Sequence, residues 1–405
     1  MRGMERFTGS FTQQEPIPED AIAAAVAVMR HGRLHRYNTL GDEAGETALL
    51  EQEFAAAMGS RHALAVASGG YALATALRAV GVKPGDRVLT NAFTLAPVPG
   101  AIASVGAVPV FVGVTEALVI DLDDLAAKAA GAKVLMLSHM RGHICDMDAL
   151  MALAKAQGLT VIEDCAHTMG ARWRGTLSGR HGLIGCYSTQ TYKHMNSGEG
   201  GLLITDDADV MARAVMLSGS YMLYPRHLAA PPPEVFEAVK YDTPNVSGRM
   251  DNLRAAILRP QLARLSDQCA AWTARYRVVE DGLRGVPGLT VIDRPEVEDF
   301  VGSSIQVLLL DWPDEAVKDV LARCLKRGVE LKWFGGAEPT GFTSRYDSWR
   351  YAPSERMPAT DHILRGIIDM RLPLTFSLDD CALIARIIRA EVGAVGQALG
   401  ARVNP

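Results

Sequence analysis

Short apolar runs rich in β-branched residues alternate with helical patterns between about residues 62 and 205. Such alternation is typical of βαβ units, because neighbouring parallel strands need a crossover of helical length between them. The strand-like runs are 63–67, 87–91, 108–112, 134–137, 160–163, 182–188 and 202–205, and the helical patterns include 71–80, 121–130 and 146–157. We therefore predict an α/β fold built on a large, mostly parallel sheet.

The second half of the chain has a different pattern. Residues 218–250 contain Pro225, Pro244 and three consecutive prolines at 231–233, so a long loop is predicted. One long helix is predicted from residue 254 to about 284, and shorter patterns follow at 289–292, 304–310, 314–327, 329–334 and 378–399. We predict three parts: an N-terminal segment, 1–30, that packs on the small domain, a large α/β domain, 31–260, and a small C-terminal α+β domain, 261–405.

Composition excludes several classes of protein. The 405 residues carry 41 basic and 46 acidic side chains, so the basic surplus typical of nucleic-acid binders is missing. No apolar run near the start approaches the ~20 residues of a membrane helix, and acidic residues precede the first one, so we expect a cytoplasmic protein with no membrane partner. The six cysteines form no C-x-x-C pair, which favours reduced thiols over disulfides or a zinc site.

A possible anion site follows the first strand-like run, where Ser68, Gly69, Gly70 and Tyr71 open a helical pattern. Glycines let the backbone approach an anion closely, and the free N–H groups of a helix N-terminus bind negative charge. These residues are therefore candidates for binding a phosphate. A plain turn between strand and helix is the alternative, because neither a Walker loop nor a G-x-G-x-x-G pattern is present.

The buried run 160–163 leads into Asp164 and His167. Carboxylates at the C-terminal edge of a parallel sheet face the crevice in which α/β proteins bind ligands. Asp164 is thus placed to contact a ligand, or alternatively to cap a following helix. His167 by itself fits a packed core histidine as well as a ligand contact. A metal is not predicted, because no zinc-binding spacing accompanies these residues.

Lys193 follows an apolar strand and precedes the glycine-rich turn 198–201. Taken alone it fits a solvated surface lysine. In a crevice, desolvation would favour its neutral amine, which attacks aldehydes. The order of an anion site, an aspartate at a strand end and then a lysine preceded by Ser188 matches what pyridoxal 5'-phosphate requires: donors for the phosphate, a carboxylate for the ring nitrogen and an amine for the aldehyde.

These residues and their order resemble those of the DegT/StrS-type aminotransferases, fold type I enzymes that depend on pyridoxal phosphate and mostly aminate keto-sugars. The resemblance covers most of the chain and is densest from about residue 54 to 256. It rests on the segments 53–55, 83–86, 93–94, 145–148, 162–164, 198–201 and 249–250.

The resemblance implies roles for single residues. Lys193 matches the lysine that bonds the cofactor, Asp164 the partner of its pyridine nitrogen, and Ser188 a serine that binds its phosphate. His167 stands where the family usually has a glutamine beside the ring oxygen. Gly69, Gly70 and Tyr71 fall at the start of the phosphate-binding helix. The resemblance also implies a homodimer whose active sites lie at the subunit interface.

The sequence departs from the family pattern in three places. Gly70 and Tyr71 replace residues with short polar side chains, and Leu95 replaces an aromatic that covers the cofactor ring, so apolar contact is expected there without stacking. Ser247 replaces an asparagine that reaches the partner subunit's phosphate. Together with the long proline-rich loop, these departures predict a substrate other than a standard nucleotide-linked sugar.

The reaction that the resemblance implies is a ping-pong transamination. An amino group passes from glutamate or glutamine to a keto-sugar or related carbonyl acceptor, with Lys193, Asp164 and His167 as the predicted catalytic residues. A dehydratase or lyase dependent on pyridoxal phosphate is an alternative, since His194 stands beside Lys193 and the ring-covering residue is changed. A non-catalytic regulatory relative is the other alternative. Arg226, His227, Tyr221, Tyr224 and Lys240 are candidates for binding an anionic group of the acceptor, or else solvated loop residues.

Overall fold

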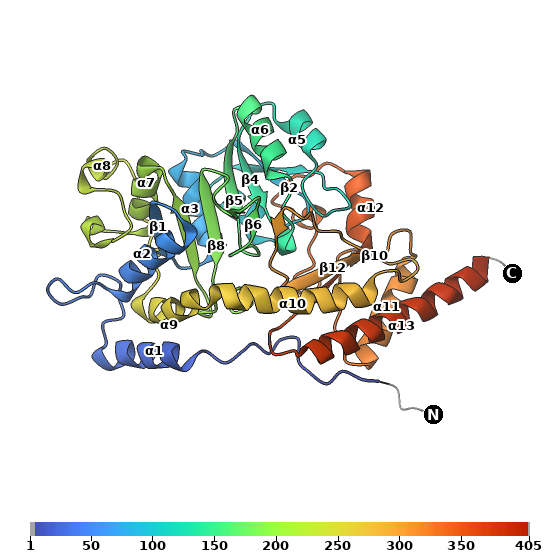
Figure 1. Ribbon diagram of the computed structural model, residues 1–405. Helices are drawn as coiled ribbons and strands as arrows, with labels where there is room; N and C mark the ends of the chain where they lie inside the picture. The colour runs from blue at the N-terminus through green and yellow to red at the C-terminus, as the bar shows by residue number, and fades with distance from the viewer. Residues whose placement is uncertain (1–4, 404–405) are drawn as a thin grey trace.

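A seven-stranded sheet forms the centre of the larger part of the molecule in the computed structural model, which describes residues 5–403 (Figure 1). The strand order is β1 (His62–Val66), β9 (Gly201–Thr205), β8 (Ile184–Ser188), β5 (Thr160–Asp164), β4 (Ala132–Ser138), β2 (Arg87–Asn91) and β3 (Val108–Val112). All neighbours pair in parallel except β9, which is antiparallel to β1 and β8. The predicted α/β fold with a mostly parallel sheet is confirmed.

Helices cover both faces of this sheet. One face packs against α3 (Gly69–Ala79), α4 (Pro97–Ser104) and α7 (Ala208–Ser218), and the other against α5 (Leu122–Lys128), α6 (Met147–Gln157) and α2 (Glu46–Met58). Side chains alternate between the faces along each strand. In β1, Leu64 and Val66 join the first core while Ala63 and Ala65 join the opposite one. Because both faces are buried, the strands are mostly apolar and do not alternate between apolar and polar residues.

The prediction of one long helix from residue 254 is wrong in one respect. The segment forms two helices, α9 (Asn252–Ala263) and α10 (Leu265–Leu283). Pro260 lies inside α9, where it removes one backbone hydrogen bond and crowds the preceding turn. Arg264 then leaves the regular helical geometry at φ −99° and ψ 0°. The two helices therefore meet at Arg264, four residues after the proline, although the helical pattern of the sequence continues through this point.

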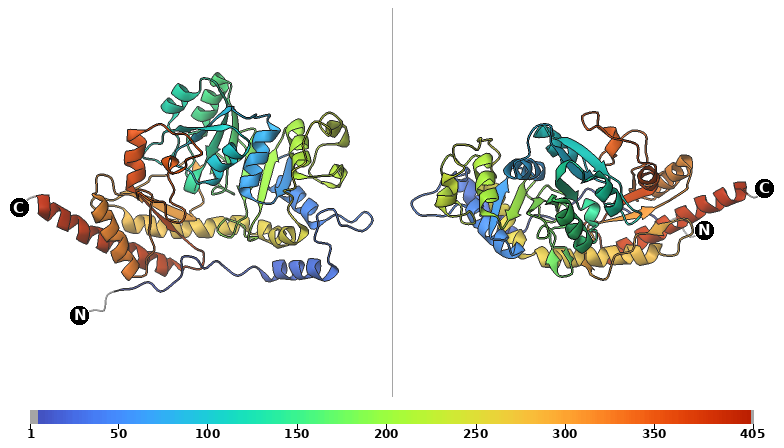
Figure 2. Two further views of the ribbon diagram at one scale, coloured as in Figure 1. Left: turned by 180° about the vertical axis from the view of Figure 1, so that it is seen from behind. Right: turned by 90° about the horizontal axis from the view of Figure 1, so that it is seen from above.

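A four-stranded antiparallel sheet forms the smaller part, in the order β10 (Thr290–Val291), β12 (Ser304–Leu308), β14 (Ile367–Arg371) and β13 (Lys332–Trp333). Its helices are α11 (Asp314–Lys326), α12 (Pro358–Gly366) and α13 (Leu378–Val403). β14 and α12 were not predicted. A further small sheet joins β11 (Glu298–Asp299), β6 (Arg172–Trp173) and β7 (Thr176–Leu177). The turned views show α13 running beside α10 (Figure 2).

The N-terminal segment contacts both parts. Phe7 and Phe11 are buried in the apolar core of the smaller part, where each packs edge-on against Phe376. Farther along, α1 (Glu19–His31) lies against α9. The domain boundaries at residues 30 and 260 stay a prediction.

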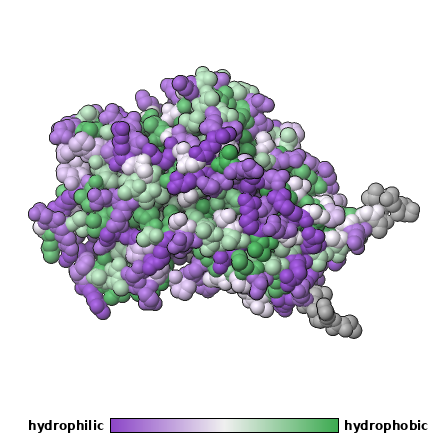
Figure 3. Space-filling model, viewed as in Figure 1, coloured by the Kyte–Doolittle hydropathy of each residue, from purple (hydrophilic) through white to green (hydrophobic). Residues whose placement is uncertain are grey.

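Residues 218–250 are largely irregular, as predicted, with one short helix, α8 (Pro233–Glu237), and a 3₁₀ turn at Tyr224–Arg226. Tyr224 stacks on Phe236 with ring centroids 4.1 Å apart, which anchors the loop. Within residues 5–403 no helix combines the length and apolarity that crossing a membrane requires. Hydrophilic and hydrophobic residues are interspersed on the face seen in Figure 3.

Candidate active site

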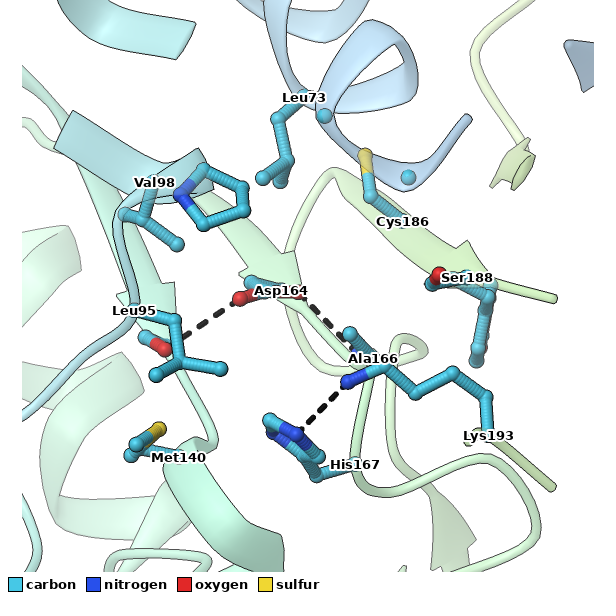
Figure 4. Close-up of a pocket in the computed structure, with 15 residues that line it drawn as sticks. Leu73, Leu95, Val98, Met140, Asp164, Ala166, His167, Cys186, Ser188 and Lys193 are labelled. Atoms are coloured by element: carbon cyan, nitrogen blue, oxygen red, sulfur yellow. Dashed lines mark hydrogen bonds between the residues drawn. The ribbon is translucent and has the colours of Figure 1, made fainter. Parts of the chain in front are cut away.

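A pocket with about 460 Å³ of empty space lies where the C-terminal ends of β4, β5 and β8 meet the N-terminus of α3 (Figure 4). This is the edge of the sheet at which α/β proteins bind ligands. Of the predicted site residues, the structure brings seven together in its lining: Gly69, Gly70, Leu95, Asp164, His167, Ser188 and Lys193.

The N-terminus of α3 forms one wall of the pocket. Ser68 caps the helix by accepting the N–H of Tyr71 at 3.1 Å, and the N–H groups of Gly69 and Gly70 find no acceptor among the described residues. A Cβ atom on Gly69 would lie only 2.8 Å from the Cβ of Ser188. The helix end, two glycines and a serine hydroxyl thus form a confined set of donors suited to a phosphate.

Asp164 ends β5 and faces the pocket, while its neighbour Glu163 points to the opposite side of the sheet. One carboxylate oxygen of Asp164 accepts the N–H of Ala166 at 3.1 Å, and the other accepts the Ser138 hydroxyl at 3.3 Å. Residues 166–170 form turns, so Asp164 does not cap a helix. Burial raises the pKa of Asp164, and the Ala166 N–H and the charge of Lys193 oppose this shift.

Glu163 has a structural role. Its carboxylate accepts the N–H groups of Gly179, His181 and Gly182 at 2.7–2.9 Å and lies 3.0 Å from Nε2 of His139. The potential ligand atoms of His139, Glu163 and Cys165 lie within 4.8 Å of one another, a spacing that could hold a metal ion. The oxygens of Glu163 are already engaged by these donors, so we assign the cluster to holding the turn at 179–182.

Lys193 lies in the turn after β8, and its Nζ is 2.7 Å from Nε2 of His167. Figure 4 shows its side chain extending toward His167 and the Asp164 end of the pocket. Burial, together with the charges of Arg141 and Arg371, lowers the pKa of Lys193 to about 7 against the opposing charge of Asp164. The lysine is therefore not a solvated surface charge, and a large fraction of it is neutral at physiological pH.

His167 is held on both sides. Its Nδ1 accepts the backbone N–H of Arg141 at 3.3 Å, so in the neutral ring the proton is on Nε2, which faces Lys193. Burial, with Lys193 and Arg141 nearby, holds the pKa of His167 well below its usual range. His167 is thus a neutral donor to the lysine amine and not an isolated core histidine.

Two predicted site residues lie outside this pocket. The Tyr71 hydroxyl donates to the backbone oxygens of Leu217, at 3.1 Å, and of Val246, which ties α3 to the proline-rich loop. Ser247 is exposed on that loop, 3.3 Å from a guanidinium nitrogen of Arg249. Within one chain, the side chains of Tyr71 and Ser247 do not line the pocket. Tyr71 belongs to the first turn of α3, whose N-terminus forms the pocket wall.

The proposed anion-binding residues of the loop are engaged elsewhere. Arg226 donates to the backbone oxygen of Tyr37 at 2.6 Å, and His227 is buried against Glu51. Lys240 pairs with Glu237 on the surface at 2.6 Å. The structure thus turns Arg226 and His227 inward.

Sequence reasoning missed several residues of the pocket. Its apolar wall and floor include Leu73, Pro97, Val98, Met140, Ala166, Cys186 and Tyr187, and Ser138 adds a hydroxyl beside Asp164. Ser138 directly follows the predicted strand 134–137, just as Asp164 follows the predicted strand 160–163, and this position was the available signal. The apolar residues carry no such signal, because in sequence they resemble any core residue.

The chain belongs to the DegT/DnrJ/EryC1/StrS aminotransferase family, whose profile matches residues 17–389. It is 32% identical over 281 residues to the "Pleiotropic regulatory protein" of Geobacillus stearothermophilus, covering 67% of this chain and 69% of that protein. It is 36% identical over 233 residues to the L-glutamine:scyllo-inosose aminotransferase of Streptomyces griseus, covering 55% of this chain and 54% of the relative. The crystal structure of 3-amino-5-hydroxybenzoic acid synthase superposes with a TM-score of 0.81 at 28% identity, covering 95% of this chain and 99% of that one.

These likenesses confirm the expected family and fold. Members of this family are aminotransferases of the pyridoxal-phosphate fold type.

Proposed function

We propose that this protein is a pyridoxal-phosphate-dependent aminotransferase that moves an amino group from glutamate or glutamine to a keto-sugar or related carbonyl compound. The observation that carries the proposal is the position of Lys193, whose amine lies in the pocket 2.7 Å from His167 and has a lowered pKa. The names of relatives that act on glutamine and scyllo-inosose support the donor and acceptor classes.

The residues of the pocket fit the cofactor. The unpaired N–H groups of Gly69 and Gly70, with the Ser188 hydroxyl, would hold its phosphate, and Asp164 would hold its ring nitrogen. Leu95 and Val98 would contact the ring through apolar surface. When bound, pyridoxal phosphate supplies an aldehyde for the amine and a ring that withdraws electrons from the substrate carbon.

Lys193 is the residue placed to carry the proton. Its neutral Nζ accepts a hydrogen bond from Nε2 of His167, so its lone pair is both available and oriented. A positioned base of this kind typically contributes about 10²–10⁴ in rate, most effectively when its pKa is near the working pH. Asp164 is fixed at the sheet edge by the Ala166 N–H and the Ser138 hydroxyl, so its carboxyl group is placed to stabilise a positive charge opposite it.

We also propose that the protein is a homodimer. The loop that carries Ser247 exposes apolar side chains to solvent in the single chain: Tyr221, Met222, Leu228, Tyr241 and Val246. Exposed apolar surface of this kind marks an interaction site, and a partner subunit would cover it. Sedimentation of the purified protein should give twice the chain mass, and Tyr241→Asp should shift it toward the monomer.

The alternative of a non-catalytic regulatory protein is supported by the name of one relative. A binding protein without chemistry would not need a half-buried pocket lysine of lowered pKa, so we favour the enzyme.

The direct test is spectroscopic. Purified protein incubated with pyridoxal phosphate should become yellow, Lys193→Ala should not, and L-glutamate should bleach the colour of the unaltered protein in a single turnover. Lys155→Ala, an exposed lysine on α6, is the matched control and should behave as the unaltered protein does. A colourless protein would refute the proposal, whereas release of water or ammonia without amino transfer would support the dehydratase or lyase.

A further inference from the structure

The N-terminal segment passes close to the turn that carries Lys193. Phe7 and Phe11 anchor it in the core of the smaller part, and between them and α1 it runs alongside α9 and α10 (Figure 1). A second cavity, with about 360 Å³ of empty space, lies between this segment, the turn and the two helices. Lys193 lines both this cavity and the pocket of the candidate active site. The lysine therefore borders two separate spaces.

The second cavity is polar and has unsatisfied hydrogen-bonding groups. Three of its lining side chains have a buried atom that makes no hydrogen bond within the described residues: Oε1 of Glu15, Nδ1 of His194 and Oε1 of Gln268. Buried polar atoms without a protein partner are costly, and native proteins usually complete them with water. Water can donate to the two oxygens and either donate to or accept from the imidazole. Three such atoms around one cavity therefore indicate a site for ordered water.

His194 fixes one side of this cavity. Its ring lies edge-on to Trp272 with the ring centroids 5.1 Å apart, and its Nε2 lies 3.2 Å from the hydroxyl of Ser303. Burial and the charge of Lys193 lower the pKa of His194 to about 3, so the ring is neutral. His194 therefore orients water at Nδ1 and does not compete with Lys193 for a proton.

Glu15 supplies the carboxylate of the cavity. Its Oε1 is buried there, although the residue as a whole is only half-buried. Burial raises the pKa of Glu15, while its own backbone N–H and the charge of Arg275 on α10 oppose this shift. A carboxylate that is buried on one side and reached by solvent on the other can take a proton from the interior and release it outside.

The location of the second cavity matters during turnover. The cofactor and a substrate would fill the first pocket, and the filling of an active site expels water from it. The second cavity lies outside that pocket, so it stays available to water while Lys193 works.

We infer that Glu15, His194 and Gln268 hold water through which Lys193 exchanges its proton with solvent. Once Lys193 has taken a proton from a substrate carbon, one N–H bond of its ammonium group breaks and the proton passes to a water of the cavity. That water gives one of its own protons to the carboxylate of Glu15. Lys193 is left as a neutral amine and Glu15 as a neutral carboxylic acid, which then releases the proton to solvent. The inference deepens the proposed function and rests on it.

The first test follows an isotope and not the overall rate. L-glutamate with deuterium on its α-carbon reacts with the holoenzyme in ordinary water for a single turnover. Mass spectrometry of the recovered pyridoxamine phosphate then gives the ratio of label lost to label kept. The unaltered protein should lose label, and Glu15→Gln, which keeps the shape of the side chain but does not take up the proton, should lower the ratio at least about tenfold.

Two further variants complete this test. Gln268→Leu removes one of the groups that hold the water and should also lower the ratio. Glu19→Gln changes an exposed carboxylate on α1 and should leave the ratio unchanged. Full retention of label in the unaltered protein, or an equal ratio in Glu15→Gln, would overturn the inference. A slower turnover with an unchanged ratio would overturn it too, since a purely structural role of the segment changes the rate but not how the label divides.

The second test needs no cofactor. A high-resolution crystal structure of the cofactor-free chain should show water bonded to Oε1 of Glu15, Nδ1 of His194 and Oε1 of Gln268. A cavity that holds no water, or that side chains close, would overturn the inference. If the protein fails to bind pyridoxal phosphate, the proposed function fails, while this structure still shows whether the cavity holds water.

Discussion

Nζ of Lys193 lies 2.7 Å from Nε2 of His167, whose other nitrogen accepts the backbone N–H of Arg141. Because Nδ1 is an acceptor, the neutral imidazole carries its proton on Nε2 and donates it to the lysine. A donor at that distance requires a lone pair on Nζ, so the contact favours the neutral amine. The geometry and the lowered pKa of Lys193 thus agree on the same protonation state.

Lys193 should therefore react as an amine at a pH where other lysines do not. With the pKa of Lys193 lowered to about 7, adduct formation between cofactor-free protein and pyridoxal phosphate should rise through pH 7 and level off above pH 8. An ordinary lysine, with a pKa of about 10.4, would still gain rate up to pH 10. Stopped-flow absorbance across pH 6–10 measures this, and a midpoint near 10 would contradict the assignment.

Asp164→Asn keeps the shape of the side chain but removes its charge. We predict that the cofactor is retained, since the phosphate cradle and Lys193 are untouched, while the donor half-reaction slows by about 10²–10³ because a neutral amide does not stabilise a positive ring nitrogen. Single-turnover absorbance with L-glutamate gives the rate. Asp209→Asn, an exposed position on α7, is the control. Equal rates in all three proteins would remove Asp164 from the mechanism.

Two adjacent glycines offer a matched test of the phosphate cradle. A Cβ at Gly69 would lie 2.8 Å from Cβ of Ser188, whereas one at Gly70 would lie 3.8 Å from Pro97, an ordinary contact. Gly69→Ala should therefore weaken cofactor binding about tenfold or more, and Gly70→Ala should change it little. Equilibrium dialysis against pyridoxal phosphate measures both. Similar affinities in the two variants would show that the space beside Ser188 is not used.

The sequence predicted the parts of this site that depend on strand ends. β2 and β3 begin and end at the predicted residues, and Asp164 and Ser188 occupy the last positions of their strands, so their convergence follows from the parallel sheet. The phosphate cradle was predictable for the same reason, because α3 starts directly after β1. Local patterns suffice where the fold itself brings the residues together.

Contacts between distant segments were not predictable. Arg141 and Arg371 are separated by 230 residues, and neither belongs to a motif, yet β4 and β14 bring both to Asp369 or its neighbourhood. His227 was considered for substrate binding, but its pairing with Glu51 depends on how the proline-rich loop folds back. Periodicity reports which residues are buried, not which distant partner neutralises a buried charge.

The buried ion pair between Arg36 and Glu51 gives a prediction about stability. Arg36 donates to both oxygens of Glu51 at 2.9 and 2.8 Å, and His227 and the N–H of Ala65 also bind this carboxylate, joining α2, β1 and the loop. Burial alone would raise the pKa of Glu51, but Arg36 and His227 outweigh it and lower the pKa to about 2.

Glu51→Gln should therefore reduce the free energy of unfolding by about 3–5 kcal/mol at pH 7, because it leaves Arg36 buried without a counter-charge. A carboxyl whose folded pKa is depressed stabilises fully above its unfolded value of about 4.5, and this contribution disappears as the pH falls toward 2. The difference in the free energy of unfolding between the unaltered protein and Glu51→Gln should therefore narrow below pH 4.5. Glu43→Gln breaks the exposed pair with Arg33 and should cost less than about 1 kcal/mol at any pH. Urea titrations at pH 7, 5 and 4 measure the free energy of unfolding of each protein. If the difference between the unaltered protein and Glu51→Gln does not change with pH, packing and not charge accounts for the lost stability.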